Sequence, residues 1–538
     1  MTLTRSMRAS ASVLALAAIA SFATSASAHK IHYPYKVGAT PIDPNRPLVH
    51  VGPYRPPFVA PSSAKSGTWK DVGSLPFTAS PWNLVLLTDG TVLVQDFCTS
   101  PNQWYKLTPD TKGKYEDGKW TKTATMPSGY VPLFMASQVL TDGRMIVNGG
   151  EYNNCSADWT NLGALYDPVK NKWTSVTAPS GWSTIGDAES IILPNGTYML
   201  ANCCDSPGQF GLASISGTTV TWSTVTAESC SGQPCNDEQG LTALPGGDVM
   251  MVDVWNHTTT SDDVDFYNPK TNTWAENGTT SCYLSDTSSF ELGPAALMPN
   301  GNVIVFGDNP NCNSLYNVST NTWTNAKLFP LSGYDVADGP AATLPDGHVL
   351  VQASPGVFNT PSHFFEYSLT ATGAQKLVQV NDPKQAGSTS SFESNMLVLP
   401  TGQVLWNNSQ GTNEVATYTP VGSPKKAWLP VVSSVSASLT VGSTGNAISG
   451  KKFNGFALGG VYGDDDQAAT NFPIVRITNT NTGDVCFARG YNFSTMGVFN
   501  TGKMHAKFDI PSTCETGAST LQVIVNGIAS AGTAVTLS

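Results

Sequence analysis

The stretch Leu140-Thr141-Asp142-Gly143-Arg144-Met145-Ile146-Val147 decides the fold, because it predicts a tight hairpin and recurs along the chain. Asp-Gly between two apolar runs is typical of a hairpin turn, since Gly adopts positive φ without steric cost. Successive copies are 46 to 55 residues apart, and their turn glycines are Gly90, Gly143, Gly196, Gly247, Gly301, Gly347 and Gly402. A period near 50 residues predicts a propeller of four-stranded units.

A second signature follows in several units and predicts the outer strands. It runs from a Tyr through an Asn turn to a Trp, as in Tyr166 to Trp173, Tyr267 to Trp274 and Tyr316 to Trp323. We expect the Trp of each outer strand to lie between neighbouring units. Trp69 precedes the first repeat, whereas the seventh repeat has no clear outer strand. The strand around Trp69 is therefore predicted to complete the last unit, which leaves no open edge.

These repeats resemble the kelch family, and the layout resembles galactose oxidase and related copper radical oxidases. The resemblance implies an all-β chain: a seven-bladed kelch-type β-propeller over residues 67–428, followed by a small β domain. From residue 429 onward, Val, Ile and Thr alternate between Gly and Asn turns, which predicts a C-terminal immunoglobulin-like β-sandwich over residues 429–538.

The resemblance also implies a copper site, and the residues test it. In that family the metal is held by a cross-linked Tyr, a Tyr-His pair and a His from the last domain. The matching positions here are Phe134 and Phe392-Glu393, and residues 486–492 contain no His. A phenyl ring neither ligates copper nor carries a phenoxyl radical. Copper is therefore not expected, and a galactose oxidase-like copper radical oxidase is the least favoured of our hypotheses.

Carboxylates occupy the register where copper ligands are missing. Nine residues before the turn glycines stand four candidate catalytic acids, Asp187, Glu238, Asp338 and Glu393, and Glu291 lies one step before the same register in the fifth repeat. The second strands end at weaker candidate metal ligands, Asp96, Glu151, Asp253 and Asp308. Three arrangements remain open: a cation such as Ca²⁺, a protonated acid beside an ionised one as in glycosidases, or acids bonded to water and backbone amides.

Aromatic residues near the same face indicate a carbohydrate, because flat rings stack on sugar faces. Trp82, Phe134 and Trp255 are the candidate substrate-binding rings, with Glu291 as a further contact and His257 as the best-placed group for proton transfer. The expected partner is a carbohydrate or another small neutral or cationic ligand. The three acids of Asp464-Asp465-Asp466 are expected to form a solvated turn, since their spacing differs from that of an EF-hand.

Composition and the first residues indicate an exported chain. Its 538 residues carry a net charge of −11, which argues against a nucleic-acid partner. Residues 1–28 have the basic start, apolar stretch and Ala-Ser-Ala end of a signal peptide, so the mature chain is expected to begin at His29. A proline-rich arm over 29–66 follows. No later segment is long and apolar enough to span a membrane. A monomer, secreted or periplasmic, is expected.

Ten cysteines, an even number, are typical of disulfides in an exported protein. Cys486 and Cys514 are the two in the C-terminal region and are predicted to pair. Cys282 with Cys312 and Cys230 with Cys235 are local choices among many. Two leading hypotheses follow: a propeller that binds or processes carbohydrate at an acidic axial pocket, and a non-enzymatic envelope or adhesion module stabilised by Ca²⁺.

Overall fold

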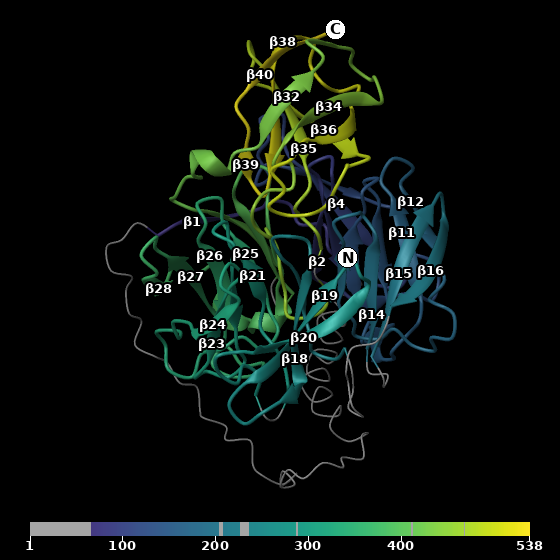
Figure 1. The fold of residues 1–538 in the computed structure, drawn as a ribbon. Coiled ribbons are helices and arrows are strands. Elements are labelled where there is room, and N and C mark those ends of the chain that lie inside the picture. Colours follow the sequence, from purple (N-terminus) through teal and green to yellow (C-terminus); the bar gives the residue numbers. More distant parts are fainter. Residues whose placement is uncertain (1–65, 204–207, 226–235, 287–288, 410–412, 467) are drawn as a thin grey trace, which may run out of the picture. The chain divides into compact units, whose positions relative to one another are not determined.

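The computed structural model describes residues 66–203, 208–225, 236–286, 289–409, 413–466 and 468–538. The predicted signal peptide, all but the last residue of the predicted proline-rich arm, and both Cys230 and Cys235 lie outside these residues. Within them the chain is all-β, with seven four-stranded antiparallel sheets and one larger C-terminal sheet (Figure 1). A membrane-spanning helix is not found among the described residues.

The seven sheets are named here in chain order of their first strands. Sheet 1 comprises β2 (Pro81–Leu86), β3 (Val92–Asp96), β4 (Trp104–Thr108) and β5 (Lys119–Lys122). Sheet 2 comprises β7 (Ala136–Val139), β8 (Met145–Asn148), β11 (Gly163–Asp167) and β12 (Lys172–Ser175); sheet 3 comprises β13 (Ser190–Ile192), β14 (Tyr198–Asn202), β15 (Gln209–Ser216) and β16 (Thr219–Val225). Sheet 4 comprises β17 (Leu241–Ala243), β18 (Val249–His257), β19 (Asp262–Asn268) and β20 (Thr273–Thr279).

The remaining sheets follow the same plan. Sheet 5 comprises β21 (Ala295–Leu297), β22 (Asn302–Phe306), β23 (Asn313–Asn317) and β24 (Thr322–Asn325); sheet 6 comprises β25 (Ala341–Thr343), β26 (Val349–Ala353), β27 (His363–Leu369) and β28 (Gln375–Gln379). Sheet 7 comprises β29 (Met396–Val398), β30 (Val404–Asn408), β31 (Glu414–Thr419) and β1 (Thr68–Asp71). A minor sheet beside sheet 2 contains β6 (Pro132–Leu133), β9 (Tyr152–Asn153) and β10 (Ser156–Ala157).

The sheets form a closed ring, because each first strand contacts the first strand of the next sheet and β29 contacts β2. The predicted closure by Trp69 is confirmed: β1 pairs with β31, and Trp69 lies opposite Tyr418. All seven predicted hairpins are present, with the turn glycines at φ between 75° and 101°. These observations place the first strands around a common axis, the arrangement of a β-propeller.

The outer-strand signature also has the predicted role. Tyr166, Tyr267 and Tyr316 each donate a hydrogen bond to the turn Asn five residues later, at 2.7 to 3.0 Å. Trp173 of sheet 2 donates from Nε1 to the Ala124 carbonyl at 3.1 Å, just beyond the last strand of sheet 1. Trp173 therefore connects sheets 1 and 2, as predicted for the outer-strand Trp.

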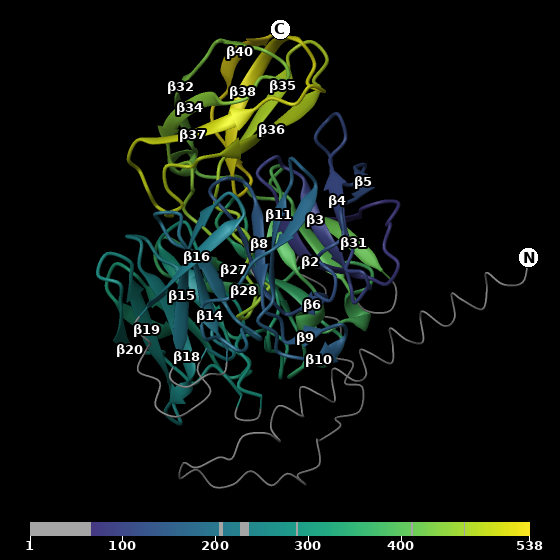
Figure 2. The ribbon, with the colours of Figure 1, turned by 90° about the vertical axis from the view of Figure 1, so that its right-hand side faces the viewer.

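The C-terminal strands gather in one continuous nine-stranded sheet (Figure 2). They are β32 (Val431–Val435), β33 (Ser438–Leu439), β34 (Asn446–Lys451), β35 (Ile474–Asn479), β36 (Val485–Tyr491), β37 (Met504–Asp509), β38 (Gly517–Val525), β39 (Ile528–Ala529) and β40 (Thr533–Leu537). The long connection between β34 and β35 leaves this sheet and lies along the first strands of the ring. Its residues 458–466 are called the axial loop below.

Candidate functional site

The axial loop is held inside the ring by hydrogen bonds to first strands. Val461 exchanges two backbone hydrogen bonds with Ala341 of β25, at 2.9 and 3.0 Å, and the Gly459 carbonyl accepts from the Val398 N–H of β29 at 2.7 Å. At its far end, Asp466 Oδ1 accepts from Asn83 Nδ2 at 3.0 Å and from the Met135 N–H at 3.3 Å. The loop thus contacts sheets 6 and 7 on one side and sheets 1 and 2 on the other.

The tip of the axial loop contradicts the expected solvated turn. Asp464, Asp465 and Asp466 have exposed fractions of 1%, 2% and 4%. They are buried because the apolar and backbone contacts of the preceding residues carry the loop into the ring. Gly463 permits this approach, since a Cβ there would lie 2.0 Å from Asp338 Oδ1 and 2.8 Å from the Leu292 carbonyl oxygen.

Three of the four candidate catalytic acids meet this tip. Asp187, Glu238 and Asp338 each lie three residues before the first strand of their sheet, which is why the repeat register predicted a common position. One carboxylate oxygen each of Asp187, Asp464 and Asp465 lie within 4.8 Å of one another. The same holds for Glu238, Asp338 and Asp464. The five residues of these two groups are called the axial acid cluster.

Several oxygens of the axial acid cluster are buried without a hydrogen bond. Among the described residues, Oδ1 of Asp187, Asp338 and Asp465 has no donor partner. The exposed fractions of Asp187 and Asp338 are 6% and 9%, and Glu238 is the half-buried member. A buried carboxylate oxygen that no donor or cation compensates is costly.

Burial raises the pKa of Asp187, Asp338 and Asp465 well above the usual range, and neighbouring carboxylates raise it further. In the part of the chain that is described, the strongest charges acting on these acids are other Asp and Glu side chains, with neither Lys nor Arg among them. Glu291 adds to the cluster, because its carboxyl group interacts with those of Glu238 and Asp338, and burial raises its pKa to about 8. Glu151 also acts on Asp187 and Glu291 through its charge.

The fourth candidate catalytic acid, Glu393, has a local structural role in its own loop. It ends the short 3₁₀ helix Ser391–Glu393, and its Oε2 accepts from the Ser390 N–H at 3.0 Å in a capping box. Burial raises its pKa to about 7. The Ser-x-x-Glu spacing was the sequence signal for this structural role.

The weaker candidate metal ligands divide by their partners. Asp96 accepts from the backbone N–H groups of Thr78 and Ala79, both at 2.9 Å. Asp253 accepts from those of Trp255 and Asn256 at 3.0 and 3.1 Å, and from Gln239 Nε2. These two acids cap loops and are not among the grouped ligand atoms. Asp308 accepts from Ser289 Oγ at 3.0 Å.

The aromatic candidates occupy different environments. Trp82 is 1% exposed and packs against Phe97 and Phe134, so the expected role in stacking on a sugar does not fit its position. Phe134 stacks on Phe392 with ring centroids 6.4 Å apart.

Trp255 is half-buried and stacks on Phe290, which immediately precedes Glu291, with ring centroids 4.4 Å apart. His257 is exposed and packs against Tyr283 at 4.8 Å between ring centroids. Trp255, Phe290 and His257 therefore form an accessible aromatic group on sheets 4 and 5.

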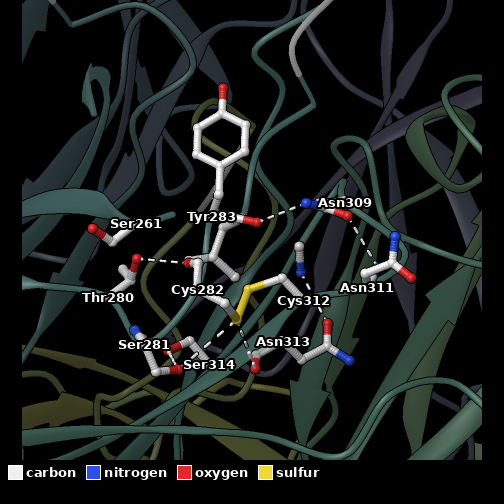
Figure 3. Close-up of a disulfide and its surroundings, with 12 residues drawn as sticks. Ser261, Thr280, Ser281, Cys282, Tyr283, Asn309, Asn311, Cys312, Asn313 and Ser314 are labelled. Atoms are coloured by element: carbon white, nitrogen blue, oxygen red, sulfur yellow. Dashed lines mark hydrogen bonds between the residues drawn. A yellow bond between two sulfur atoms is a disulfide. The ribbon is translucent and has the colours of Figure 1, made fainter. Parts of the chain in front are cut away.

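Three disulfides are found in the described residues. The predicted Cys486–Cys514 and Cys282–Cys312 pairs are both present, and Cys98–Cys155 is a third. Around Cys282–Cys312, Ser281 Oγ and Ser314 Oγ lie 2.7 Å apart, and Asn309 Nδ2 donates to the Tyr283 carbonyl at 3.0 Å (Figure 3). This disulfide fixes the loops that flank the aromatic group. The Cys230–Cys235 prediction lies outside the described residues.

Comparisons with known proteins give structural neighbours only. No protein-family model and no curated protein sequence matches the chain. Its structure is similar to that of a fungal alcohol oxidase of the AA5 family in complex with copper, with a TM-score of 0.49 and 13% identity over 88% of this chain and 100% of that chain. It is also similar to that of a putative gluconolactonase, with a TM-score of 0.33 and 12% identity over 66% of this chain and 93% of that chain.

Proposed function

We propose that the protein is an exported seven-bladed kelch-type propeller with a C-terminal immunoglobulin-like domain, and that its axial acid cluster binds a hard divalent cation of the calcium class. One observation carries the proposal: carboxylate oxygens from separate segments of the described chain converge within 4.8 Å in two groups, and Asp187, Asp338 and Asp465 of these groups each have a buried oxygen without a donor among the described residues. A cation bound there would compensate the negative charges of these carboxylates, whose nearest charged neighbours are themselves negative.

The donor set favours Ca²⁺. All five members of the cluster are carboxylates, and Ca²⁺ prefers six to eight oxygen ligands. Asp464 and Asp465 belong to the axial loop, whereas Asp187, Glu238 and Asp338 belong to sheets 3, 4 and 6. A bound cation would therefore join the C-terminal region to the ring.

The residues do not fit copper. Copper sites use imidazole, thiolate or phenolate ligands, and the corresponding position on sheet 2 is Phe134, whose ring packs against Trp82 and Phe392. Neither ligand group contains His, Cys or Tyr. A copper radical reaction is therefore not proposed for this chain.

Metal content and thermal unfolding test the cation site. Protein treated with EDTA and dialysed should rebind Ca²⁺, measured by elemental analysis, and its melting temperature should rise with Ca²⁺ but not with equimolar Cu²⁺. At a free Ca²⁺ concentration 100 times Kd, the gain is about 2.7 kcal/mol. Asp338→Asn should show a smaller gain than the wild type, whereas Glu393→Gln, a buried acid at the same register, should keep the full gain. Failure to retain any divalent cation would overturn the proposal.

A second candidate function is carbohydrate binding or hydrolysis at the same face. The half-buried Trp255–Phe290 stack beside Glu291 favours it, because aromatic faces bind sugars and carboxylates accept from their hydroxyls. If the acids catalyse hydrolysis, carboxylate oxygens within 4.8 Å fit a retaining mechanism, which uses a gap of about 5 Å, better than an inverting one.

A glycan panel separates this candidate from a non-enzymatic, cation-stabilised module. Wild type and Trp255→Ala should be compared for binding and for release of reducing sugar. Binding that Trp255→Ala abolishes, with unchanged melting temperature, would support a carbohydrate site. Absence of both binding and turnover across the panel would favour the non-enzymatic module.

Export is supported by the three disulfides, since such bonds persist in oxidising compartments. Expression of the full chain in a bacterium with a periplasm, followed by mass spectrometry, should give a mature protein that begins at His29. A cytoplasmic protein that retains Met1 would contradict export.

A further inference from the structure

We propose, resting on the cation site proposed above, that the axial acid cluster binds two divalent cations and that the carboxylate of Asp464 bridges them. One cation would be held by Asp187, Asp464 and Asp465, and the other by Glu238, Asp338 and Asp464.

The geometry separates the cluster into two groups. Each group has three carboxylate oxygens within 4.8 Å of one another, and the two groups share Asp464 alone. A single compact site would bring all five oxygens within one such distance. A carboxylate has two oxygens, so one side chain can contact two ions, as in two-metal sites with ions about 4 Å apart.

Each of the two groups contains at least one buried carboxylate oxygen without a hydrogen-bond donor among the described residues. In the first, Oδ1 of Asp187 and Oδ1 of Asp465 are buried with no donor among the described residues. In the second, the same is true of Asp338 Oδ1. All three side chains are at least nine-tenths buried, at 6%, 2% and 9% exposed. One cation placed in either group would leave the other group's oxygens uncompensated.

The charge of the cluster also favours more than one ion. With Glu291, which contacts Glu238 and Asp338, six carboxylates share the site. When they are ionised, one divalent cation leaves an excess of four negative charges in a buried region. Two cations reduce the excess to two, which the half-buried Glu238 side can share with water.

Two members of the second group, Glu238 and Asp338, have an unusual backbone conformation. Glu238 and Asp338 have φ of 61° and 49°, in the left-handed region that non-glycine residues rarely occupy. Such conformations persist where the surrounding structure enforces them, and they concentrate at ligand sites. In sheet 3 the left-handed residue is Gly186, with φ of 68°, one position before Asp187, and in sheet 2 Phe134 at the same register as Asp338 also has φ of 49°.

Metal stoichiometry and spin coupling test the proposal. Protein stripped with EDTA is titrated with Ca²⁺ by calorimetry and with Mn²⁺ followed by electron paramagnetic resonance. We expect two ions per chain, and an exchange-coupled spectrum when both sites hold Mn²⁺, because a carboxylate bridge couples the spins. One ion per chain would overturn the two-ion inference and leave the cation site standing. Binding of neither metal would overturn both.

Variants identify which ion each group holds. Asp465→Asn and Asp338→Asn should each retain one ion and lose the coupled spectrum, and Asp464→Asn should lose the coupling with both sites weakened at least tenfold. Glu393→Gln is the matched control and should keep two coupled ions. If Asp464→Asn does not fold, the two single-group variants still decide the question. Loss of all metal in both of them would show one shared site and overturn the inference.

Discussion

Two sets of buried acids lie on the same ring and differ in what their oxygens contact. Asp96 and Asp253 accept two or more hydrogen bonds, chiefly from backbone N–H groups of the segment before β2 and of β18. Asp187, Asp338 and Asp465 each retain a buried oxygen that no donor in the described residues contacts. The comparison shows that burial alone does not mark a functional acid. The first set holds nearby backbone in place, and the second set needs a partner that the described part of the chain does not supply.

The largest expected effect is a reversal of sign at Asp338. In EDTA, Asp338→Asn should raise the free energy of unfolding by about 1–3 kcal/mol, since it removes an uncompensated buried carboxylate and Asn tolerates positive φ. At a free Ca²⁺ concentration 1,000 times Kd the wild type should be the more stable, because the ion that the variant loses adds about 4.1 kcal/mol. Urea unfolding with and without Ca²⁺ measures both. If Asp338→Asn changes the free energy of unfolding in the same direction in EDTA and in Ca²⁺, Asp338 would not differ from the acids that only accept hydrogen bonds, such as Asp253.

Asp253→Ala should behave in the opposite way. It leaves the N–H groups of Trp255 and Asn256 without their acceptor, which should cost about 2 kcal/mol with and without Ca²⁺. Urea unfolding and calorimetry measure the stability and the Ca²⁺ affinity, and the affinity should match that of the wild type. A lower Ca²⁺ affinity in this variant would place Asp253 in the second set.

Gly463→Ala tests whether the tip of the axial loop must approach Asp338 closely for Ca²⁺ to bind. The new methyl group would meet Asp338 Oδ1, so the tip must move to accept it. We expect a loss of about 1–2 kcal/mol and a Ca²⁺ affinity lowered at least tenfold. Calorimetry with Gly387→Ala as a control, where a Cβ meets nothing within 4 Å and φ is likewise not positive, separates crowding at the tip from the general effect of an added methyl group. Equal Ca²⁺ affinity in both variants would show that the tip is not a ligand.

The smallest expected effect on stability is at Asp346 and Glu366, two acids that contact the histidine His348. His348 Nδ1 lies 3.3 Å from Glu366 Oε2 and 3.6 Å from Asp346 Oδ2, and the hydrogen bond to Glu366 raises the pKa of His348 above 6.5, with Lys376 opposing the rise. A raised His pKa contributes stability that is complete below about pH 6.5 and is lost as the pH rises through the folded-state pKa. His348 is partly exposed, so a few tenths of a kcal/mol is expected. Unfolding between pH 5 and 9 should show this slope in the wild type and not in His348→Gln.

Much of the ring could be predicted from the sequence because its determinants are local. Each hairpin requires one glycine with positive φ, and the repeat places that glycine at a constant offset from the next strand. That offset also located Asp187, Glu238 and Asp338 correctly as neighbours. The same register could not separate them from Glu393, since the difference is the hydrogen bond from the Ser390 N–H.

The axial loop was the main error of sequence interpretation. A short run of Asp after Gly has the composition of an exposed turn, and its burial results from contacts with strands more than a hundred residues earlier in the chain, such as β7 and β25. One signal was present: the connection between β34 and β35 is long for a structureless loop and contains Leu458, Val461 and Tyr462. Apolar residues in a long connection indicate that it packs against another part of the fold.

The closure of the ring by β1 sets an order of assembly during synthesis. The Gly67 N–H donates to the hydroxyl of Tyr418, 351 residues later in the chain, so sheet 7 remains incomplete until β31 has been synthesised. The axial loop is made later still. Sheets 1 to 6 can fold while the ribosome is still working, but the five carboxylates meet only after the ring has closed around its axis. Metal uptake would therefore report, molecule by molecule, that the ring has closed and that the axial loop has entered it.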